Sequence, residues 1–198
     1  MAAEAPRSVI PACHARSAMP IHAFADESCR GSRYLVAAVI VMPGKLRDAR
    51  RELRGLLLPG QRELHFNDQQ DPRRRVLADA IARLPIEVRI YQRTRERYFE
   101  PARQDCIEQL ANDLLVAGAH RLVLDSRGAM DRHDERMIQS TFVGHPFEAR
   151  FNYEHIDSTC ESMLWAADAA AWCFGAGGTW RKRVEPIVGA VTDLDCPR

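Results

Sequence analysis

The sequence lacks any apolar stretch long enough to span a membrane. Its longest one runs only from Tyr34 to Met42, whereas a spanning helix needs about 20 apolar residues. The first twenty residues also lack the apolar segment of a secretory signal. We therefore expect a cytoplasmic protein with no membrane partner.

Cysteine pairs with a recognisable spacing are missing as well. The six cysteines are Cys13, Cys29, Cys106, Cys160, Cys173 and Cys196. None of them forms a C-x-x-C pair or a cluster with zinc spacing. A chain of 198 residues can build its core without disulfides. We expect reduced thiols, as in other cytoplasmic proteins.

Lysine is scarce, and the net charge is only +1, so no overall cationic field surrounds the protein. Arginines are instead grouped, at residues 47–54, 73–75, 89–97 and 181–183. The guanidinium group binds phosphate well. Arg73, Arg74 and Arg75 are our candidates for contact with nucleic acid, and the alternative for each group is a solvated helix face.

The pattern along the chain predicts one α/β domain over residues 21–198, preceded by a disordered tail over residues 1–20 in which Met19 is a second candidate start. Predicted strands cover residues 21–26, 33–42, 86–91, 120–125 and 149–156. Predicted helices cover residues 46–57, 71–84, 101–118, 130–142 and 161–176. The short connection over residues 27–32 indicates an antiparallel hairpin. This order predicts a mixed sheet with helices on both faces.

Four acidic residues stand where a strand or a helix would display them. They are Asp26, Glu63, Asp125 and Asp168. Asp26 and Asp125 end predicted strands, which is where open α/β sheets bind ligands. Asp168 lies among alanines of the last helix, where a charge needs a partner or a metal. Such carboxylates suit Mg²⁺ or Mn²⁺, and two such ions can promote phosphodiester cleavage.

Simpler roles for these acids remain open at this stage. Asp26 and Asp125 could cap turns, and Asp168 could pair with an arginine. Glu27 points to the opposite side of its strand and is a candidate for a supporting role beside the site. His65, two residues after Glu63, is a candidate supporting residue or proton shuttle. Ser158 to Glu161 matches a helix capping box.

Four segments resemble the large bacterial family called domain of unknown function 3800. The segments are FADESCRGSRYLVAAVIV at 24–41, ELHF at 63–66, LVLDSR at 122–127 and SMLWAADAAAWCFGA at 162–176. They occur in the family's order. Cys29 stands where that family has glycine, and Trp165 where it often has glutamine.

The resemblance implies a ribonuclease H-like fold whose metal-binding acids are Asp26, Glu63, Asp125 and Asp168. It favours a metal-dependent nuclease that cleaves the phosphodiesters of nucleic acid with Mg²⁺ or Mn²⁺. Two alternatives stay open. One is a non-catalytic module that binds nucleic acid or protein, and the other is a hydrolase of small phosphoesters.

Overall fold

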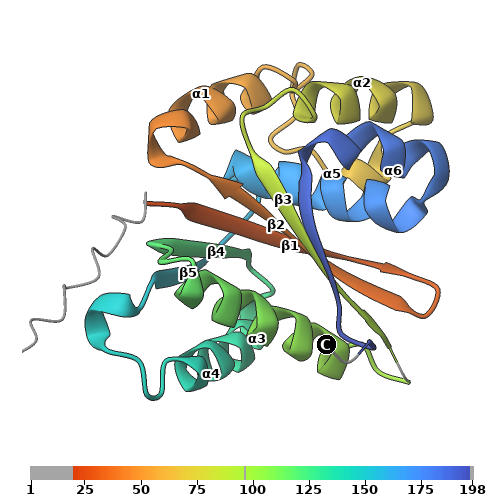
Figure 1. Cartoon of the computed structure of the whole chain (residues 1–198). Coiled ribbons are helices and arrows are strands. Elements are labelled where there is room, and N and C mark those ends of the chain that lie inside the picture. The colour runs from red at the N-terminus through yellow and green to blue at the C-terminus, as the bar shows by residue number, and fades with distance from the viewer. Residues whose placement is uncertain (1–19, 96, 197–198) are drawn as a thin grey trace, which may run out of the picture.

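The computed structural model describes residues 20–95 and 97–196, which form a six-stranded sheet with helices on both faces (Figure 1). The strands are β1 (His22–Arg30), β2 (Arg33–Val41), β3 (Glu87–Thr94), β4 (Arg121–Asp125), β5 (Asn152–Ile156) and β6 (Val188–Asp193). The α-helices are α1 (Pro43–Arg54), α2 (Asp71–Ile81), α3 (Glu100–Val116), α4 (Asp131–Thr141), α5 (Ser162–Ala176) and α6 (Gly178–Val184). Short 3-10 helices are η1 (Phe66–Asp68), η2 (Gly128–Met130), η3 (Phe147–Ala149) and η4 (Glu185–Ile187). The predicted tail, apart from Pro20, lies outside the described residues.

The strand order is β5-β4-β1-β2-β3-β6. β1 pairs antiparallel with β2, and β2 pairs antiparallel with β3. On its other side β1 pairs in parallel with β4, which in turn pairs in parallel with β5. The predicted hairpin and mixed sheet are therefore confirmed. The parallel pairing of β1 with β4 brings the carboxyl ends of these two strands to one edge of the sheet.

The hairpin is longer than the sequence pattern suggested. β1 continues to Arg30 and β2 begins at Arg33, so only Gly31 and Ser32 form the turn. Gly31 adopts a φ of 57°, which glycine tolerates best and which tight two-residue hairpins require. The prediction that the first strand ends at Asp26 is wrong, because polar residues continue a strand when backbone pairing extends beyond the core.

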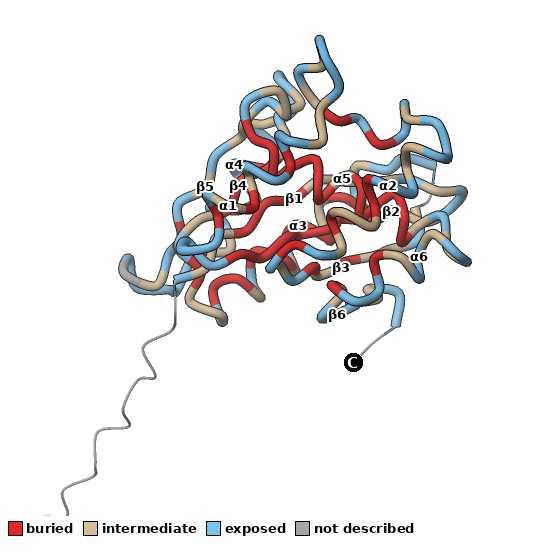
Figure 2. Tube along the Cα trace, turned by 90° about the horizontal axis from the view of Figure 1, so that it is seen from above, coloured by how far each residue is buried: buried red, intermediate tan, exposed pale blue. Residues whose placement is uncertain are grey.

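Two apolar layers cover the sheet, one on each face. α1, α2, α5 and α6 pack on one face, and α3 and α4 pack on the other (Figure 1). The most buried part of the chain follows the central strands and the helices directly above and below them (Figure 2). Because side chains alternate along a strand, Phe24 faces the first layer while Ala23 and Ala25 face the second.

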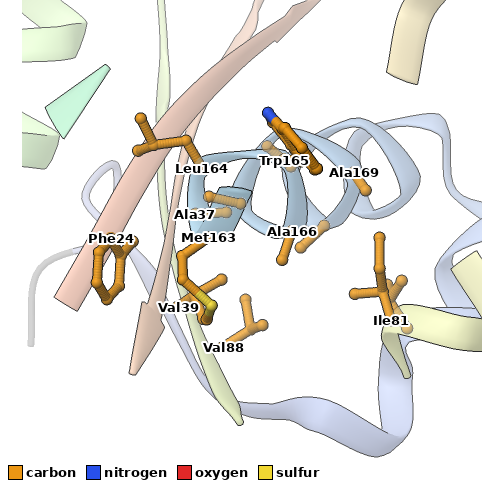
Figure 3. Packing of buried hydrophobic residues seen from close by; sticks show 14 of the residues in the cluster. Phe24, Ala37, Val39, Ile81, Val88, Met163, Leu164, Trp165, Ala166 and Ala169 are labelled. Carbon is orange, nitrogen blue, oxygen red and sulfur yellow. The ribbon is translucent and has the colours of Figure 1, made fainter. Parts of the chain in front are cut away.

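Helix α5 is almost completely buried, which explains why its sequence is apolar on all sides. It packs against the central strands, with Met163 and Ala166 among Phe24, Val39 and other sheet residues (Figure 3). The small alanines allow the helix to lie close to the sheet. This close contact carries Asp168, the helix's acidic residue, toward β1.

The start of α5 differs from the predicted capping box. Glu161 itself is the N-cap, and its carboxylate accepts a hydrogen bond from the backbone N–H of Met163 at 3.1 Å. The same carboxylate receives two hydrogen bonds from Arg50 of α1. Ser158 lies outside the cap and donates to Glu63 instead. At the start of α2, Gln70 is the N-cap and Asp71 is the first helical residue.

We expect Glu161→Gln to lower the free energy of unfolding by about 2 kcal/mol, because it weakens both a helix cap and a largely buried ion pair. The side chain of Glu161 is only 4% exposed. Urea unfolding followed by circular dichroism measures the change. Asp48→Asn on the exposed face of α1 is the matched control and should shift stability by less than about 0.5 kcal/mol. Equal stability of the two variants would contradict the prediction.

Some elements escaped the sequence pattern. α6 and β6 were not predicted, and β6 extends the sheet by pairing in parallel with β3. Glu63 lies in an irregular segment between α1 and η1. Among the described residues, no helix combines the length and the apolar character needed to cross a membrane. The cysteines in the described part of the chain are free, and Cys13 lies outside it.

Candidate functional site

Asp26 and Asp125 occupy neighbouring positions on two adjacent strands. Ala25 of β1 pairs with Leu124 of β4, so the two aspartates follow in the next position of each strand. They share a sheet face with Phe24 and Val123, the face that α5 covers. Adjacent strands lie about 4.8 Å apart. The sheet therefore brings the two carboxylates side by side beneath α5.

Asp168 approaches the same place from α5. A small pocket at this end of the sheet is lined by Asp26, Asp125 and Asp168, together with His65 and Ser158. One carboxylate oxygen of Asp168 accepts a hydrogen bond from the backbone N–H of Phe66 at 2.8 Å. This bond fixes the Asp168 side chain and links α5 to η1.

Glu63 and His65 reach the site from the segment before η1. The hydroxyl of Ser158 donates a hydrogen bond to Glu63, so Glu63 is held at the margin of the pocket rather than among its lining residues. His65 lines the pocket, and its Nδ1 lies 3.7 Å from Asp168 Oδ2. With 62% of its side chain exposed, His65 stands between the acids and solvent.

The acids affect one another electrostatically. Burial, followed by the charges of Asp168 and Glu27, raises the pKa of Asp26 well above its ordinary value. Burial also raises the pKa of Asp168, against the hydrogen bond from Phe66 and the charge of His65. For Asp125, burial and the charges of Glu27 and Asp157 raise the pKa to about 6. The site thus holds more negative charge than its surroundings compensate.

A pH series should reveal this uncompensated charge. In the metal-free protein the free energy of unfolding should rise as the pH falls from about 6 to about 4, because the folded state then binds more protons than the unfolded chain. Asp125→Asn should flatten the rise, since one raised pKa is removed. Urea midpoints measured in a chelator across this range test the prediction. Identical pH profiles for the two proteins would refute it.

The other supporting candidate, Glu27, lies on the opposite face of β1 and belongs to a buried ionic network. Arg103 Nε donates to Glu27 Oε1 at 3.2 Å, and its Nη1 donates to Asp134. His155 Nε2 lies 3.1 Å from Asp134 Oδ2, and Arg127 Nη2 lies 3.6 Å from Asp134 Oδ1. Arg103 and Asp134 are 1% and 0% exposed. Glu27 therefore neutralises buried arginines instead of lining the pocket.

The sequence does contain one signal of this network, which is a charged residue on the apolar stripe of each of two helices. Arg103 precedes Ile107 and Leu110 of the buried stripe of α3, at helical spacing. Asp134 likewise precedes the buried Ile138 by one helical turn. A charged residue on an apolar stripe indicates a buried partner, but only the fold shows which one.

The three candidate nucleic-acid-binding arginines of α2 have different surroundings. Arg73 donates to the backbone oxygen of Leu56. Arg74 donates to the backbone oxygen of Phe66 at 3.0 Å and forms an ion pair with Asp71. Arg75 is exposed. Of the three, Arg75 is thus the one available to a partner, while Arg74 holds η1 in place.

No family model matches the chain, and no curated protein matches it. Among solved structures, the chain is similar to one from the PCNA:RNase HII complex of Archaeoglobus fulgidus, with a TM-score of 0.50 and 16% identity. The similarity covers 78% of this chain and 71% of that one. The protein has a ribonuclease H-like fold. At this identity the similarity establishes the fold alone.

Within this ribonuclease H-like fold, the acids of the pocket are the possible ligands of a divalent metal. Among residues 20–95 and 97–196, no group of three or more Asp, Glu, His or Cys side chains is arranged as a ready-made metal site. Yet no arginine or lysine in the same ranges forms an ion pair with Asp26, Asp125 or Asp168. Clustered carboxylates with no arginine or lysine partner suit a hard cation such as Mg²⁺ in chemistry and charge.

Proposed function

We propose that this protein is a divalent-metal-dependent nuclease that cleaves phosphodiester bonds of nucleic acid. The observation that carries the proposal is the meeting of Asp26, Asp125 and Asp168 at one pocket, where no arginine or lysine of the described residues forms an ion pair with them. They come from two adjacent parallel strands and a buried helix. The ribonuclease H-like fold and the similarity to a chain of the PCNA:RNase HII complex add support. Membership in the domain of unknown function 3800 family is part of the same proposal.

In this proposal each acid has a distinct position. Asp26 and Asp125 would hold Mg²⁺ or Mn²⁺ from the sheet, and Asp168 would hold it from α5. A bound divalent ion activates water and stabilises the leaving oxygen in phosphoryl displacement. Glu63, oriented by the Ser158 hydroxyl, adds a further carboxylate at the margin.

His65 is the group best placed to move a proton. Its ring is exposed to solvent and its Nδ1 lies close to Asp168. A neutral imidazole can accept a proton from water, and an imidazolium can deliver one to the leaving oxygen. Delivery of a proton to the leaving oxygen is the role we propose for His65.

The test is a cleavage assay with labelled single-stranded DNA, single-stranded RNA, duplex DNA and an RNA·DNA hybrid. The wild type should cleave at least one of these with manganese or magnesium and none with EDTA. Asp125→Asn should remove the activity, and Asp48→Asn, the same chemical change outside the pocket, should retain it.

The remaining outcomes identify the alternatives. Turnover of bis(p-nitrophenyl) phosphate without cleavage of any oligonucleotide would replace the proposal with a hydrolase of small phosphoesters. Oligonucleotide binding without any turnover would replace it with a non-catalytic binding module. Metal-independent cleavage would contradict the assigned role of the carboxylates.

A further inference from the structure

Arg30 of β1 and Trp172 of α5 face each other on the same two elements that carry Asp26 and Asp168. Arg30 is four residues after Asp26 on β1 and therefore lies on the same strand face, toward α5. Trp172 is four residues, about one helical turn, after Asp168 on α5. The acids and this arginine–tryptophan pair thus follow one another along the same contact between strand and helix.

Trp172 is a fixed platform for guanidinium groups. Its indole N–H donates to Asn67 Oδ1 at 3.2 Å, and the ring is only 8% exposed. The guanidinium carbon of Arg30 lies 4.3 Å from the ring centroid, and that of Arg74 lies 4.6 Å from it. Contacts of this kind are favourable and hold the arginine heads in place.

The two arginines differ in what else they bind. Arg74 is engaged by the backbone of η1 and by Asp71. Arg30 has no carboxylate partner in the part of the chain that the structure describes, and its Nη2 is buried there without a hydrogen-bond partner. A buried donor left unpaired costs about 1–3 kcal/mol. Arg30 therefore holds a positive charge that no carboxylate of the described residues neutralises, four residues along β1 from Asp26.

The backbone near Arg30 accommodates this position closely. A Cβ atom at Gly175 would lie 3.1 Å from Arg30 Cγ and 2.8 Å from Leu35 Cδ1. Glycine at this point of α5 leaves the space in which the arginine stem passes over the helix. The stem and the head of Arg30 are thus both held before any ligand arrives.

We propose that Arg30 binds a phosphodiester group of the nucleic-acid strand that enters the site. The inference rests on the proposed nuclease function and adds a substrate-binding residue to it. Four residues of strand span about 13 Å, so the bound group would be a phosphate flanking the one that is cleaved. The guanidinium would donate to the phosphate from N–H groups other than the buried Nη2 and would orient the strand across the acids.

The experiment is fluorescence anisotropy of fluorescein-labelled 20-nucleotide single-stranded DNA, single-stranded RNA and RNA·DNA hybrid at several salt concentrations. EDTA is present, so that binding is measured without metal and without cleavage. The variants are Arg30→Gln, which keeps a polar stem without charge, and Arg30→Lys, which keeps the charge without the planar fork. Arg150→Ala is the control, because Arg150 stacks on Phe142 on the opposite face of the sheet.

Arg30→Gln should weaken binding of the preferred probe about tenfold, as expected for a lost charged hydrogen bond. It should also lower the slope of log K against log salt by about 0.7–0.9, the value for one phosphate contact. Arg30→Lys should restore the slope but only part of the affinity. Arg150→Ala should bind as the wild type does. Thermal midpoints close to wild type for both Arg30 variants separate lost contact from lost folding.

Wild-type affinity and slope in a folded Arg30→Gln protein would overturn the inference and leave the cleavage proposal intact. Absence of binding by the wild type to every probe would overturn it as well. Arg30-dependent binding by a protein that cleaves nothing would support the phosphate site while refuting the nuclease function. The two proposals therefore fail by different measurements.

Discussion

Asp26→Asn should reduce metal-dependent cleavage by at least about 100-fold, the usual loss when a group that stabilises transition-state charge is removed. The same change should raise the stability of the metal-free protein. Asp26 is close to Asp168 and Glu27, whose charges help to raise its pKa. A neutral amide removes that repulsion while keeping a similar shape.

The melting temperature gives the matching measurement. Manganese at about 100 times its Kd should stabilise the wild type by about 2.7 kcal/mol, or about 5–10 °C for a chain of this size. Asp26→Asn should lose most of this shift, and Asp48→Asn should keep it. If manganese leaves the melting temperature of the wild type unchanged, the proposed metal site is contradicted.

Asp134→Asn should lower the free energy of unfolding by about 3–5 kcal/mol, the range for removing one partner of a buried ion pair. Asp134 is fully buried and contacts Arg103, His155 and Arg127. Without its charge, Arg103 keeps Glu27 as its one carboxylate partner among the described residues. Urea unfolding measures the loss. Glu135→Gln, on the exposed side of α4, is the control and should change stability by less than about 0.5 kcal/mol.

The pH dependence of this network has the opposite sign to that of the pocket. Burial alone would raise the pKa of Asp134, but the hydrogen bonds from His155 and Arg103 hold it below its ordinary value. Its contribution to stability is therefore full above about pH 4 and is lost as the pH falls through the lowered pKa. Asp134→Asn should remove that acid-side loss. A variant that matches the wild type in stability and pH profile would contradict the assigned role.

The two faces of β1 thus serve different purposes. Asp26 faces α5 and adds to an uncompensated cluster, whereas Glu27 faces α3 and α4 and neutralises Arg103. Alternation along the strand separates adjacent residues of equal charge. One carboxylate is thereby kept available to a cation while its neighbour stabilises the fold.

The sequence by itself determined the elements whose patterns are local. Alternation and apolar runs located β1 to β5, the spacing of apolar residues located α1 to α5, and the hairpin followed from the short connection around Gly31. The mixed sheet with helices on both faces followed from their order. The sequence also singled out Asp125 and Asp168, because a charge beside an apolar run or among alanines is unusual. β6 has no buried residue, so its sequence lacks the alternation of apolar and polar residues that predicts a strand.

Only the tertiary structure decided which charges meet. Pairing of β1 with β2 extends the strand beyond Asp26, and the packing of α5 on this face of the sheet places Arg30 above Trp172. Glu161 became a helix cap bound to Arg50, and Ser158 a partner of Glu63, through contacts between residues about 100 positions apart. Arg74 binds the backbone of η1, while Arg30 has no carboxylate partner among the described residues. Local patterns depend on neighbours along the chain, whereas ionic partners depend on distances in space that only the folded sheet and helices set.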